Sequence, residues 1–491
     1  MSTGNSARTV TRRTLLGGAA AMAGLAAARG LIAQPSTVTN PEELKKIEAA
    51  LPARAPAVPR KARRLLIFDL NVGYGGHGSI PTANTAFTLM GQKTGAFETV
   101  VSRDPAVFRP ESLAQFDAVF FNNTVGNCFE DPALRQSLVE FVYRGGGLMG
   151  VHGTSVAFTK WPGAIEDWPE FGIMLGARGA NHKANDEHVF IKLDDPTHPV
   201  NQVFGGQDFD YRDEFFRVHE PYSRDRVRVL LSIDTARTDM QQQPSYGAVV
   251  RADNDYALAW VRQYGLGRVF YCTIAHHPAV FWDPKMLEFY LAATQFALGD
   301  LAAPTTPSAK LTPAIRAQEK LGWRLVLLPS NESTFFETID RAAQLGLLYV
   351  GGNEHQKVSE DIPKPLDGRL TDDEMMRIRL KLDCAGVSLV IYQADWTFDD
   401  ADPRSIAQFL MKFGVEVFVG KDGIFFPDDR PREFAAMDEA AKNNSIGQFL
   451  QQMRMRTRQP VVLTLKSTDE AAQNIEAFNT AVVQLANGGQ T

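Results

Sequence analysis

Short apolar runs alternate with amphipathic segments from residue 64 to residue 300. The run at 64–70 centres on four consecutive apolar residues, which is typical of a strand that is buried on both faces. Similar runs predict strands at 97–102, 117–122, 148–151, 189–193, 228–231, 256–262 and 268–273. Helices are predicted at 83–94, 131–143 and 284–297. Strands that alternate with such helices predict an α/β fold with a doubly wound, mostly parallel sheet.

The C-terminal third of the chain has a shorter repeat of strand and helix. Apolar runs predict strands at 325–328, 347–350, 387–392, 415–419 and 460–465. Amphipathic segments predict helices at 335–345, 372–385, 405–413 and 469–485. This alternation is typical of a (β/α) barrel, but eight units usually need about 250 residues. We therefore expect residues 323–491 to form a partial barrel, truncated or completed by another wall, after a linker at 301–322.

The N-terminal residues have the features of an export signal. Arg12 and Arg13 form a twin-arginine pair, and a weakly hydrophobic run rich in Ala and Gly follows them. This run contains an arginine, so we expect no permanent membrane span. The sequence predicts a twin-arginine signal peptide at 1–34 and a periplasmic or secreted protein, with a Sec signal or a degenerate anchor as alternatives. Residues 35–62 predict a leader with one short helix near 42–51.

Composition and charge narrow the class of protein. A hydrophobic content of 44% is ordinary for a soluble globular chain, and the part after the signal is long enough for two or three domains. The net charge of −6 comes from mixed signs without a basic stripe, so we expect no nucleic-acid partner. Cys128, Cys272 and Cys384 are too dispersed for a disulfide framework or a zinc cluster. Buried free thiols are favoured over a pair between the first two.

One histidine stands where α/β enzymes carry a functional side chain. His152 follows the predicted strand at 148–151, within the glycine-rich stretch 145–153. A polar residue at a sharp turn from strand to helix projects at the carboxyl end of the strand, where open α/β sheets bind ligands. Related architectures place a Ser or Cys nucleophile here, whereas His acts as a base, an acid or a metal ligand. The sequence predicts an enzyme-like site without covalent acyl transfer.

Eight of the nine histidines lie between residues 77 and 277. Because the loops after parallel strands meet at one edge of a sheet, we expect His77, His152 and His276 to share a cleft. His182 and Glu214, from the segment between them, could complete it. Three imidazoles and a carboxylate suit Zn²⁺, Mn²⁺ or another divalent first-row metal, and they equally suit metal-free acid–base chemistry on a sugar.

The candidate site residues divide into three groups. The catalytic candidates are His152 and Glu214, the metal ligands are His182 and His276, and the substrate-binding candidates are His77, Asp213, Trp161 and Trp282. Structural alternatives are backbone capping by His77, an ion pair of Glu214 with Arg212 or Arg217, and buried core positions for the tryptophans.

Several motifs in the first part of the chain occur in the order found in a known family. They are Gly-His-Gly-Ser-Ile-Pro at 76–81, the glycine-rich stretch at 145–153, Asp-Pro-Thr-His-Pro-Val at 195–200, Asp213-Glu214, and the segments 264–271 and 275–284. With these motifs, residues 63–300 resemble the trehalose-utilization (ThuA-like) domain. The resemblance implies a sheet like that of class I glutamine amidotransferases. It also implies carbohydrate metabolism, with 3-keto glycosides or related sugars as substrates.

The last part of the chain is similar to a second family. The segments 337–350, 370–374 and 381–387 resemble the sugar-phosphate isomerase/epimerase, or xylose-isomerase-like, barrel. Full members hold a metal with Glu, Asp and His from later strands, but no histidine follows His355 here. Glu354 follows the second predicted strand and Asp395 the third, so a sugar-facing edge could remain. We expect a degraded barrel used for packing, substrate contact or assembly, with an active lyase or isomerase as the alternative.

Two functions from different classes follow. In the first, the protein is an exported carbohydrate enzyme that removes a proton beside a keto group, so that isomerisation or β-elimination results. In the second, it is a non-catalytic sugar-binding or scaffold protein. The expected partner is a small-molecule carbohydrate, and a homo-oligomer would cover the strand edges of a truncated barrel.

Overall fold

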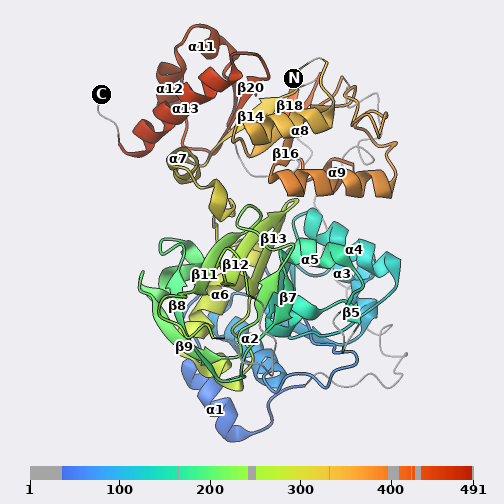
Figure 1. Ribbon diagram of the computed structural model, residues 1–491, viewed down its shortest axis with the longest axis vertical. Helices are drawn as coiled ribbons and strands as arrows, with labels where there is room; N and C mark the ends of the chain where they lie inside the picture. Colours follow the sequence, from blue (N-terminus) through green and yellow to red (C-terminus); the bar gives the residue numbers. More distant parts are fainter. Residues whose placement is uncertain are drawn as a thin grey trace, which may run out of the picture. The chain divides into compact units, whose positions relative to one another are not determined.

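The computed structural model describes residues 36–160, 162, 165–241, 250–330, 332–395, 409–421, 423–425 and 433–488. Within these residues the chain forms a nine-stranded sheet and a seven-stranded sheet, each with helices around it (Figure 1). The predicted signal peptide at 1–34 and Trp161 lie outside the described residues. No helix in the described ranges is both long and apolar enough to cross a membrane.

The nine-stranded sheet has the order β2-β1-β3-β4-β13-β12-β11-β8-β9. Its parallel half contains β2 (Glu98–Ser102), β1 (Arg64–Phe68), β3 (Ala118–Asn122), β4 (Gly147–Val151) and β13 (Gly267–Cys272). Its other half, β12 (Ala257–Tyr264), β11 (Arg228–Ile233), β8 (Glu187–Leu193) and β9 (Phe209–Asp213), is antiparallel. The molecule is therefore a mixed α/β protein, with the predicted parallel arrangement in one half of this sheet.

The antiparallel half differs from the predicted parallel arrangement because the connection between β12 and β13 is short. Only Gly265 and Leu266 separate β12 from β13, which is too short for the crossover that two parallel strands require. Gly265 has a φ of 61°, and an added Cβ would meet Tyr143, so this tight hairpin needs glycine. The sequence predicts these strands correctly but not their direction.

Helices cover both faces of the parallel half. On one face α2 (Ile80–Thr94) and α6 (Pro284–Leu298) pack against Ile67, and on the other α4 (Pro132–Tyr143) and α5 (Pro169–Leu175) pack against Phe68. Figure 1 shows α3 (Pro110–Leu113), α4 and α5 grouped together. Successive strand residues point to opposite faces, so each strand contributes to two cores. This burial on both sides explains the continuous apolar run that predicts β1.

Short elements between the long strands bring additional residues to the edge of the sheet. A 3-10 helix, η2 (His152–Val156), follows β4 directly. Strands β7 (Arg178–Asn181) and β10 (Arg217–His219) pair antiparallel as a separate two-stranded sheet. A small hairpin, β5 (Thr159–Lys160) and β6 (Ile165–Glu166), lies between η2 and α5 in the sequence. The sequence does not predict these elements, because two to five residues carry no readable periodicity.

The leader is tied to the parallel half of the large sheet. It contains α1 (Pro41–Ala50), close to the predicted helix. The side-chain amide of Asn84 donates to the carbonyl of Ser36, and Arg103 donates both to the Ser36 hydroxyl at 2.7 Å and to Asp69 at 2.8 Å. Asp69 is almost fully buried just after β1. These contacts form what we call the leader clamp, made of Ser36, Asp69, Asn84 and Arg103.

The seven-stranded sheet has the order β18-β17-β16-β15-β14-β20-β19. Its strands are β14 (Trp323–Leu328), β15 (Tyr349–Asn353), β16 (Ser388–Gln393), β17 (Val417–Gly420), β18 (Gly423–Phe425), β19 (Glu433–Ala436) and β20 (Val461–Lys466). All neighbours are parallel except β17 and β18. The sheet curls as a half-barrel, and its identity as a truncated isomerase barrel stays a prediction.

Helices accompany this second sheet as the repeat predicts. They are α7 (Pro313–Leu321), α8 (Phe335–Gln344), α9 (Asp372–Ala385), α11 (Asp438–Lys442), α12 (Ile446–Arg456) and α13 (Ala471–Ala486). Helix α7 lies within the predicted linker and packs against α13. Of the helix predicted at 405–413, residues 405–408 lie outside the described residues, and residues 409–412 are helical.

Substitution of one glycine in β4 tests how tightly this strand packs against α6 and β3. A Cβ at Gly147 would lie 2.4 Å from the carbonyl oxygen of Ala297 in α6 and 2.7 Å from the Cβ of Ala118 in β3. We predict that Gly147→Ala lowers the free energy of unfolding by about 1–3 kcal/mol, because the helix and strand must move apart. Urea unfolding measures the loss. Gly78→Ala is the control, since a Cβ there meets nothing within 4 Å, and equal effects of the two changes would contradict the prediction.

Candidate functional site

Three histidines meet at the carboxyl ends of parallel strands. His77 lies in the loop after β1, His152 follows β4 directly, and His276 lies in the loop after β13. In the sheet order β1-β3-β4-β13, β4 and β13 are neighbours, and only β3 separates β1 from β4. The ring centroids of His77 and His152 are 4.9 Å apart, and His276 lies 5.4 Å and 5.2 Å from them. The structure thus brings together the three rings that the strand order predicts to be close.

His152 adopts a strained backbone conformation. Its φ of 42° lies in the left-handed region, which costs a residue other than glycine on the order of 1 kcal/mol or more. The surroundings hold this turn in place: Tyr271 donates to the His152 carbonyl oxygen at 2.8 Å, and ring Nδ1 lies 2.9 Å from the carbonyl oxygen of Thr273. Gly153 follows, where a Cβ would come within 3.0 Å of His77. The turn therefore directs the imidazole inward and leaves room for the neighbouring histidine.

Glu214 lies among the histidines. Its Oε1 is 3.2 Å from Nε2 of His152, and its Oε2 is 3.2 Å from Nδ1 of His182 and 3.8 Å from Nε2 of His276. The residue is only 6% exposed. Among the described residues it has no ion pair with Lys or Arg.

The two arginines considered as partners of Glu214 pair elsewhere. Arg217 binds Glu187 at 2.6 Å, and Arg212 binds Asp186 at 3.4 Å. The alternative of an ion pair between Glu214 and either arginine does not occur in the structure. Among the described residues, the ion-pair partners of this carboxylate are therefore imidazoles.

The buried histidines are neutral at pH 7. Burial lowers the pKa of His77 to about 2, that of His152 to about 3 and that of His276 to about 4, and the neighbouring imidazoles lower the pKa of His77 and His276 further. The carbonyl of Thr273 can only accept a hydrogen bond, so Nδ1 of His152 carries the hydrogen and Nε2 presents a lone pair to Glu214. Two acceptors at 3.2 Å repel each other unless a proton or a cation lies between them.

Four residues have the composition and spacing of a metal site, and we call them the histidine cluster: His77, His152, Glu214 and His276. One ligand atom from each lies within 4.8 Å of all the others. In a tetrahedral site, ligand atoms at 2.0–2.2 Å from the ion are about 3.3–3.6 Å apart, so the most widely separated ligand atoms would have to approach each other by about 1 Å. Nδ1 of His77 and Nδ1 of His276 are buried without a hydrogen-bond partner. Orphaned nitrogens, neutral imidazoles and an unpaired carboxylate fit a divalent cation.

His182 borders the histidine cluster without belonging to it. It follows β7 and is 27% exposed, and its Nδ1 lies close to both Glu214 and the carbonyl of Lys183. Phe216 and Tyr74 form aromatic walls, with ring centroids 4.8 Å from His152 and 5.1 Å from His77 respectively. The role of His182 as a metal ligand stays a prediction, and its contacts favour a partnership with Glu214.

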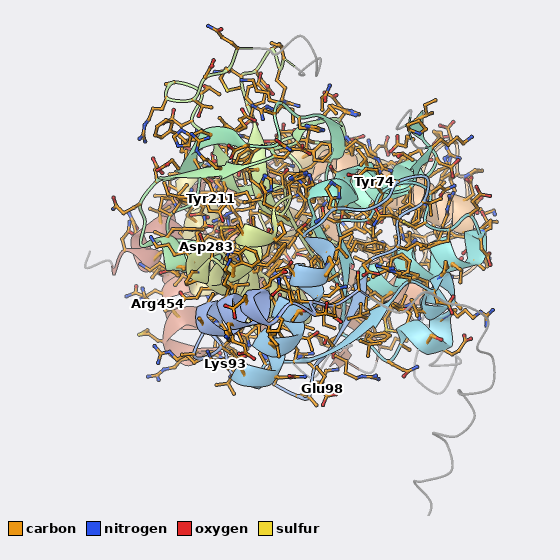
Figure 2. All side chains as sticks on the ribbon, turned by 90° about the horizontal axis from the view of Figure 1, so that it is seen from below. Tyr74, Lys93, Glu98, Tyr211, Asp283 and Arg454 are labelled. Atoms are coloured by element: carbon orange, nitrogen blue, oxygen red, sulfur yellow. The ribbon has the colours of Figure 1, made fainter. Side chains whose placement is uncertain are left out.

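The side chains of Asp213 and Trp282, two predicted substrate-binding residues, make their contacts with groups other than the side chains of the histidine cluster. The carboxylate of Asp213 is fully buried and accepts hydrogen bonds from the backbone amides of His276 and His277 at 3.1 and 3.0 Å. It supports the loop after β13 rather than reaching out to a substrate. Trp282 packs on the core beside α1, where Lys46 lies 5.0 Å above its ring. Nearby, Tyr211 of β9 donates to Asp283 at 3.4 Å (Figure 2), which fixes the strand before Asp213.

Asn123 is a site residue that the sequence reading misses. It follows β3, is fully buried and has a φ of 54°. Its Oδ1 accepts from the amide of Gly153 at 3.0 Å, and its Nδ2 donates to the carbonyl of Ala275 at 3.0 Å and to the hydroxyl of Ser79 at 3.2 Å. These three partners stand one or two residues from His152, His276 and His77. One side chain therefore connects the three histidine loops.

Comparisons with known proteins find a family model and solved structures that are similar to this half of the chain. Residues 64–297 match the family model described as ThuA, trehalose utilisation, and this part of the chain is a ThuA-like domain. A ThuA-like protein from Bacteroides uniformis ATCC 8492 is 18% identical, with a TM-score of 0.40, over 49% of this chain and 94% of that one. Another from Parabacteroides merdae ATCC 43184 is 16% identical, with a TM-score of 0.33, over 50% and 93%.

A more distant similarity involves a larger enzyme. The beta-galactosidase from Bacillus circulans sp. alkalophilus is 13% identical, with a TM-score of 0.30, and the match covers 52% of this chain and 33% of the enzyme. No curated protein matches the chain.

Asn123→Asp tests the connection between the three loops. An aspartate keeps the acceptor for Gly153 but loses both donated hydrogen bonds, and it brings a carboxylate towards the Ala275 carbonyl. We predict a loss of about 2–4 kcal/mol in the free energy of unfolding, measured in urea. Gln202→Ala, at an exposed amide bonded to Thr197, should change stability by less than about 0.5 kcal/mol. If Asn123→Asp leaves the free energy of unfolding unchanged, the three loops do not depend on the hydrogen bonds of Asn123.

Because the three imidazoles are neutral in the folded protein, the free energy of unfolding of the metal-free protein should depend on pH. Unfolded histidines take up protons below about pH 6.5 while the buried ones do not, so stability falls from pH 6.5 to pH 5. Burial raises the pKa of Asp213 to about 7, which acts in the opposite direction because the folded state then binds its proton first. Three histidines outweigh this one carboxyl, so we expect a net loss.

Urea unfolding at pH 7, 6 and 5 measures this loss. The groups that face His152 are Glu214, His77, His276 and His182. In His152→Gln the slope with pH should be shallower by about 1.4 kcal/mol per pH unit, because one buried histidine no longer resists protonation. Identical slopes for the two proteins would mean that His152 is charged in the folded state.

Proposed function

We propose that residues 64–297 form a carbohydrate enzyme whose histidine cluster binds a divalent first-row metal, Zn²⁺ or Mn²⁺. The observation that carries this proposal is the convergence of three neutral imidazoles, one buried and two half-buried, on a carboxylate that has no Lys or Arg partner among the described residues. The match to a family described as trehalose utilisation supports a sugar as the substrate. Oxidised sugars such as 3-keto glycosides have both a carbonyl oxygen and acidic neighbouring C–H groups, which suits acid–base chemistry.

The chain's residues divide the work of such a reaction. His77, His152 and His276 would hold the ion as neutral nitrogen donors, and the Thr273 carbonyl fixes the tautomer of His152. A bound divalent cation would polarise the substrate carbonyl oxygen. Glu214 presents its second oxygen towards His182, which is partly exposed. This pair leads from the buried cluster towards solvent.

The proton transfer then follows from the position of Glu214. Its carboxylate removes the proton from the carbon beside the keto group, and the electrons of the broken C–H bond pass to the carbonyl. Return of the proton to the former carbonyl carbon, together with passage of the hydroxyl proton of the deprotonated carbon to the enolate oxygen, moves the keto group and gives isomerisation. Departure of a substituent from the β carbon with its bonding electrons gives elimination instead. His182 exchanges the proton of Glu214 with solvent. This step needs no oxidant or reductant.

The twin-arginine pair of residues 1–34 supports export of this enzyme. The twin-arginine route carries folded proteins, so the metal would be acquired before export. The periplasm or the extracellular space is then its place of action.

Elemental analysis of purified protein without a histidine tag tests the metal. We predict that the wild type contains metal and that His276→Ala loses about one metal ion per chain, because a ligand of the histidine cluster is removed. His182→Ala should keep its metal, since His182 lies outside the cluster. His188→Ala, at an exposed His–Asp pair on β8, is the matched control and should also keep it. Absence of metal from every protein would overturn the metal site.

Hydrogen exchange tests the chemistry independently of product identity. When the wild type is incubated with a 3-keto glycoside in D₂O, we expect the sugar to incorporate deuterium at the carbon beside the keto group, which NMR detects. The Glu214→Gln variant should not catalyse this exchange. His182→Ala should slow the exchange without removing metal. Sugar binding without any exchange in the wild type would instead support a non-catalytic sugar-binding protein.

A further inference from the structure

A second group of potential ligands lies at the carboxyl edge of the seven-stranded sheet. Strands β15 and β16 are parallel neighbours, and their last residues, Asn353 and Gln393, stand opposite each other. Glu354 and His355 follow β15 directly, and Asp395 follows β16 after one residue. The pairing register therefore places these three residues side by side at the edge of the sheet where ligands of parallel α/β sheets bind.

The three side chains converge on a common point. Nε2 of His355 lies 3.5 Å from Oε1 of Glu354 and 3.4 Å from Oδ2 of Asp395. One ligand atom from each lies within 4.8 Å of the other two. The backbone amide of Asp395 donates to Oε1 of Glu354 at 2.6 Å, and the amide of His355 donates to Asn353 at 3.0 Å. The first of these bonds joins the ends of the two strands, and the second holds the turn that follows β15.

The negative charge of this group is not balanced by the described residues. Glu354 is 8% exposed, yet within the described ranges neither it nor Asp395 pairs with Lys or Arg. Lys357 and Lys421 line the same cavity, but Lys357 pairs with Glu360 at 2.7 Å, and no ion pair among the described residues joins Lys421 to Glu354 or Asp395. A largely buried carboxylate without a counter-ion is costly, so a bound cation would stabilise it.

A pocket and an orphaned polar atom give an independent sign of a ligand. The three residues line a cavity of about 740 Å³. Gln356 lines the same cavity and is 6% exposed. Its amide nitrogen donates to the Ser333 carbonyl and the Thr338 hydroxyl, which fixes the orientation of the amide, and its Oε1 is buried without a partner. A buried acceptor in the wall of a polar cavity indicates that something else satisfies it.

We propose that Glu354, His355 and Asp395 bind a divalent first-row cation, separately from the histidine cluster. Two carboxylates and one imidazole are a mixed oxygen and nitrogen set, which suits Mn²⁺ and Zn²⁺. Three protein ligands leave coordination positions open towards the cavity. Because His355 and Asp395 are mostly exposed, this ion exchanges with solvent more readily than an ion in the buried cluster.

Titration of the metal-stripped full chain with Mn²⁺, followed by the EPR signal of free Mn²⁺, tests the proposal. We expect two bound ions in the wild type and one in the double variant His355→Ala/Asp395→Asn. Both side chains are about three-quarters exposed, so the double variant should fold normally, which circular dichroism checks. Glu332→Gln, at a carboxylate that lines the same cavity outside the ligand group, is the matched control and should bind two ions.

The histidine cluster is tested in the same titration by His276→Ala. If the cluster binds no metal, the wild type binds one ion and the double variant none, so the proposed function fails while this inference stands. If the double variant binds as many ions as the wild type with unchanged affinity, the second site does not exist. A ten-fold or larger weakening confined to the double variant supports it.

Discussion

The site depends on one buried carboxylate that has no arginine or lysine partner in the described part of the chain. The carboxylate of Glu214 needs a positive charge beside it, and the surrounding imidazoles His77, His152 and His276, which burial keeps neutral, need a partner for their lone pairs. A cation at the centre satisfies both requirements, because it stabilises the carboxylate and uses the lone pairs of the neutral rings. The strained turn at His152, the hydrogen bonds of Asn123 and the buried Asp213 all serve to hold these groups together.

Much of the fold could be predicted from the sequence because burial on both faces leaves a clear pattern. The apolar run of β1 and the amphipathic helices around it are readable, and with them the edge at which His77, His152 and His276 meet. Strand direction is not readable in the same way. The two-residue connection before β13 makes half of the sheet antiparallel, although its strands look the same in sequence.

The remaining site residues show where a pattern of residue types gives too little information. Asp213 and Glu214 are adjacent, and neighbours in an extended chain point in opposite directions; one lies beneath a loop and the other faces the histidines. Asn123 looks like an ordinary turn residue, because its importance comes from three partners far away in sequence. Trp282 has the aromatic character of a sugar platform but packs beside α1.

The pairing of β4 with β13 has a consequence for the order of folding. The bond that fixes the tautomer of His152 joins residues 121 positions apart, and the leader clamp joins Ser36 to Arg103 across 67. Contacts of such long range form slowly, since the intervening loops must be closed first. The histidines therefore come together only when the central sheet is nearly complete. An ion held by them would bind the finished domain and not its precursors, so its uptake would mark the end of folding.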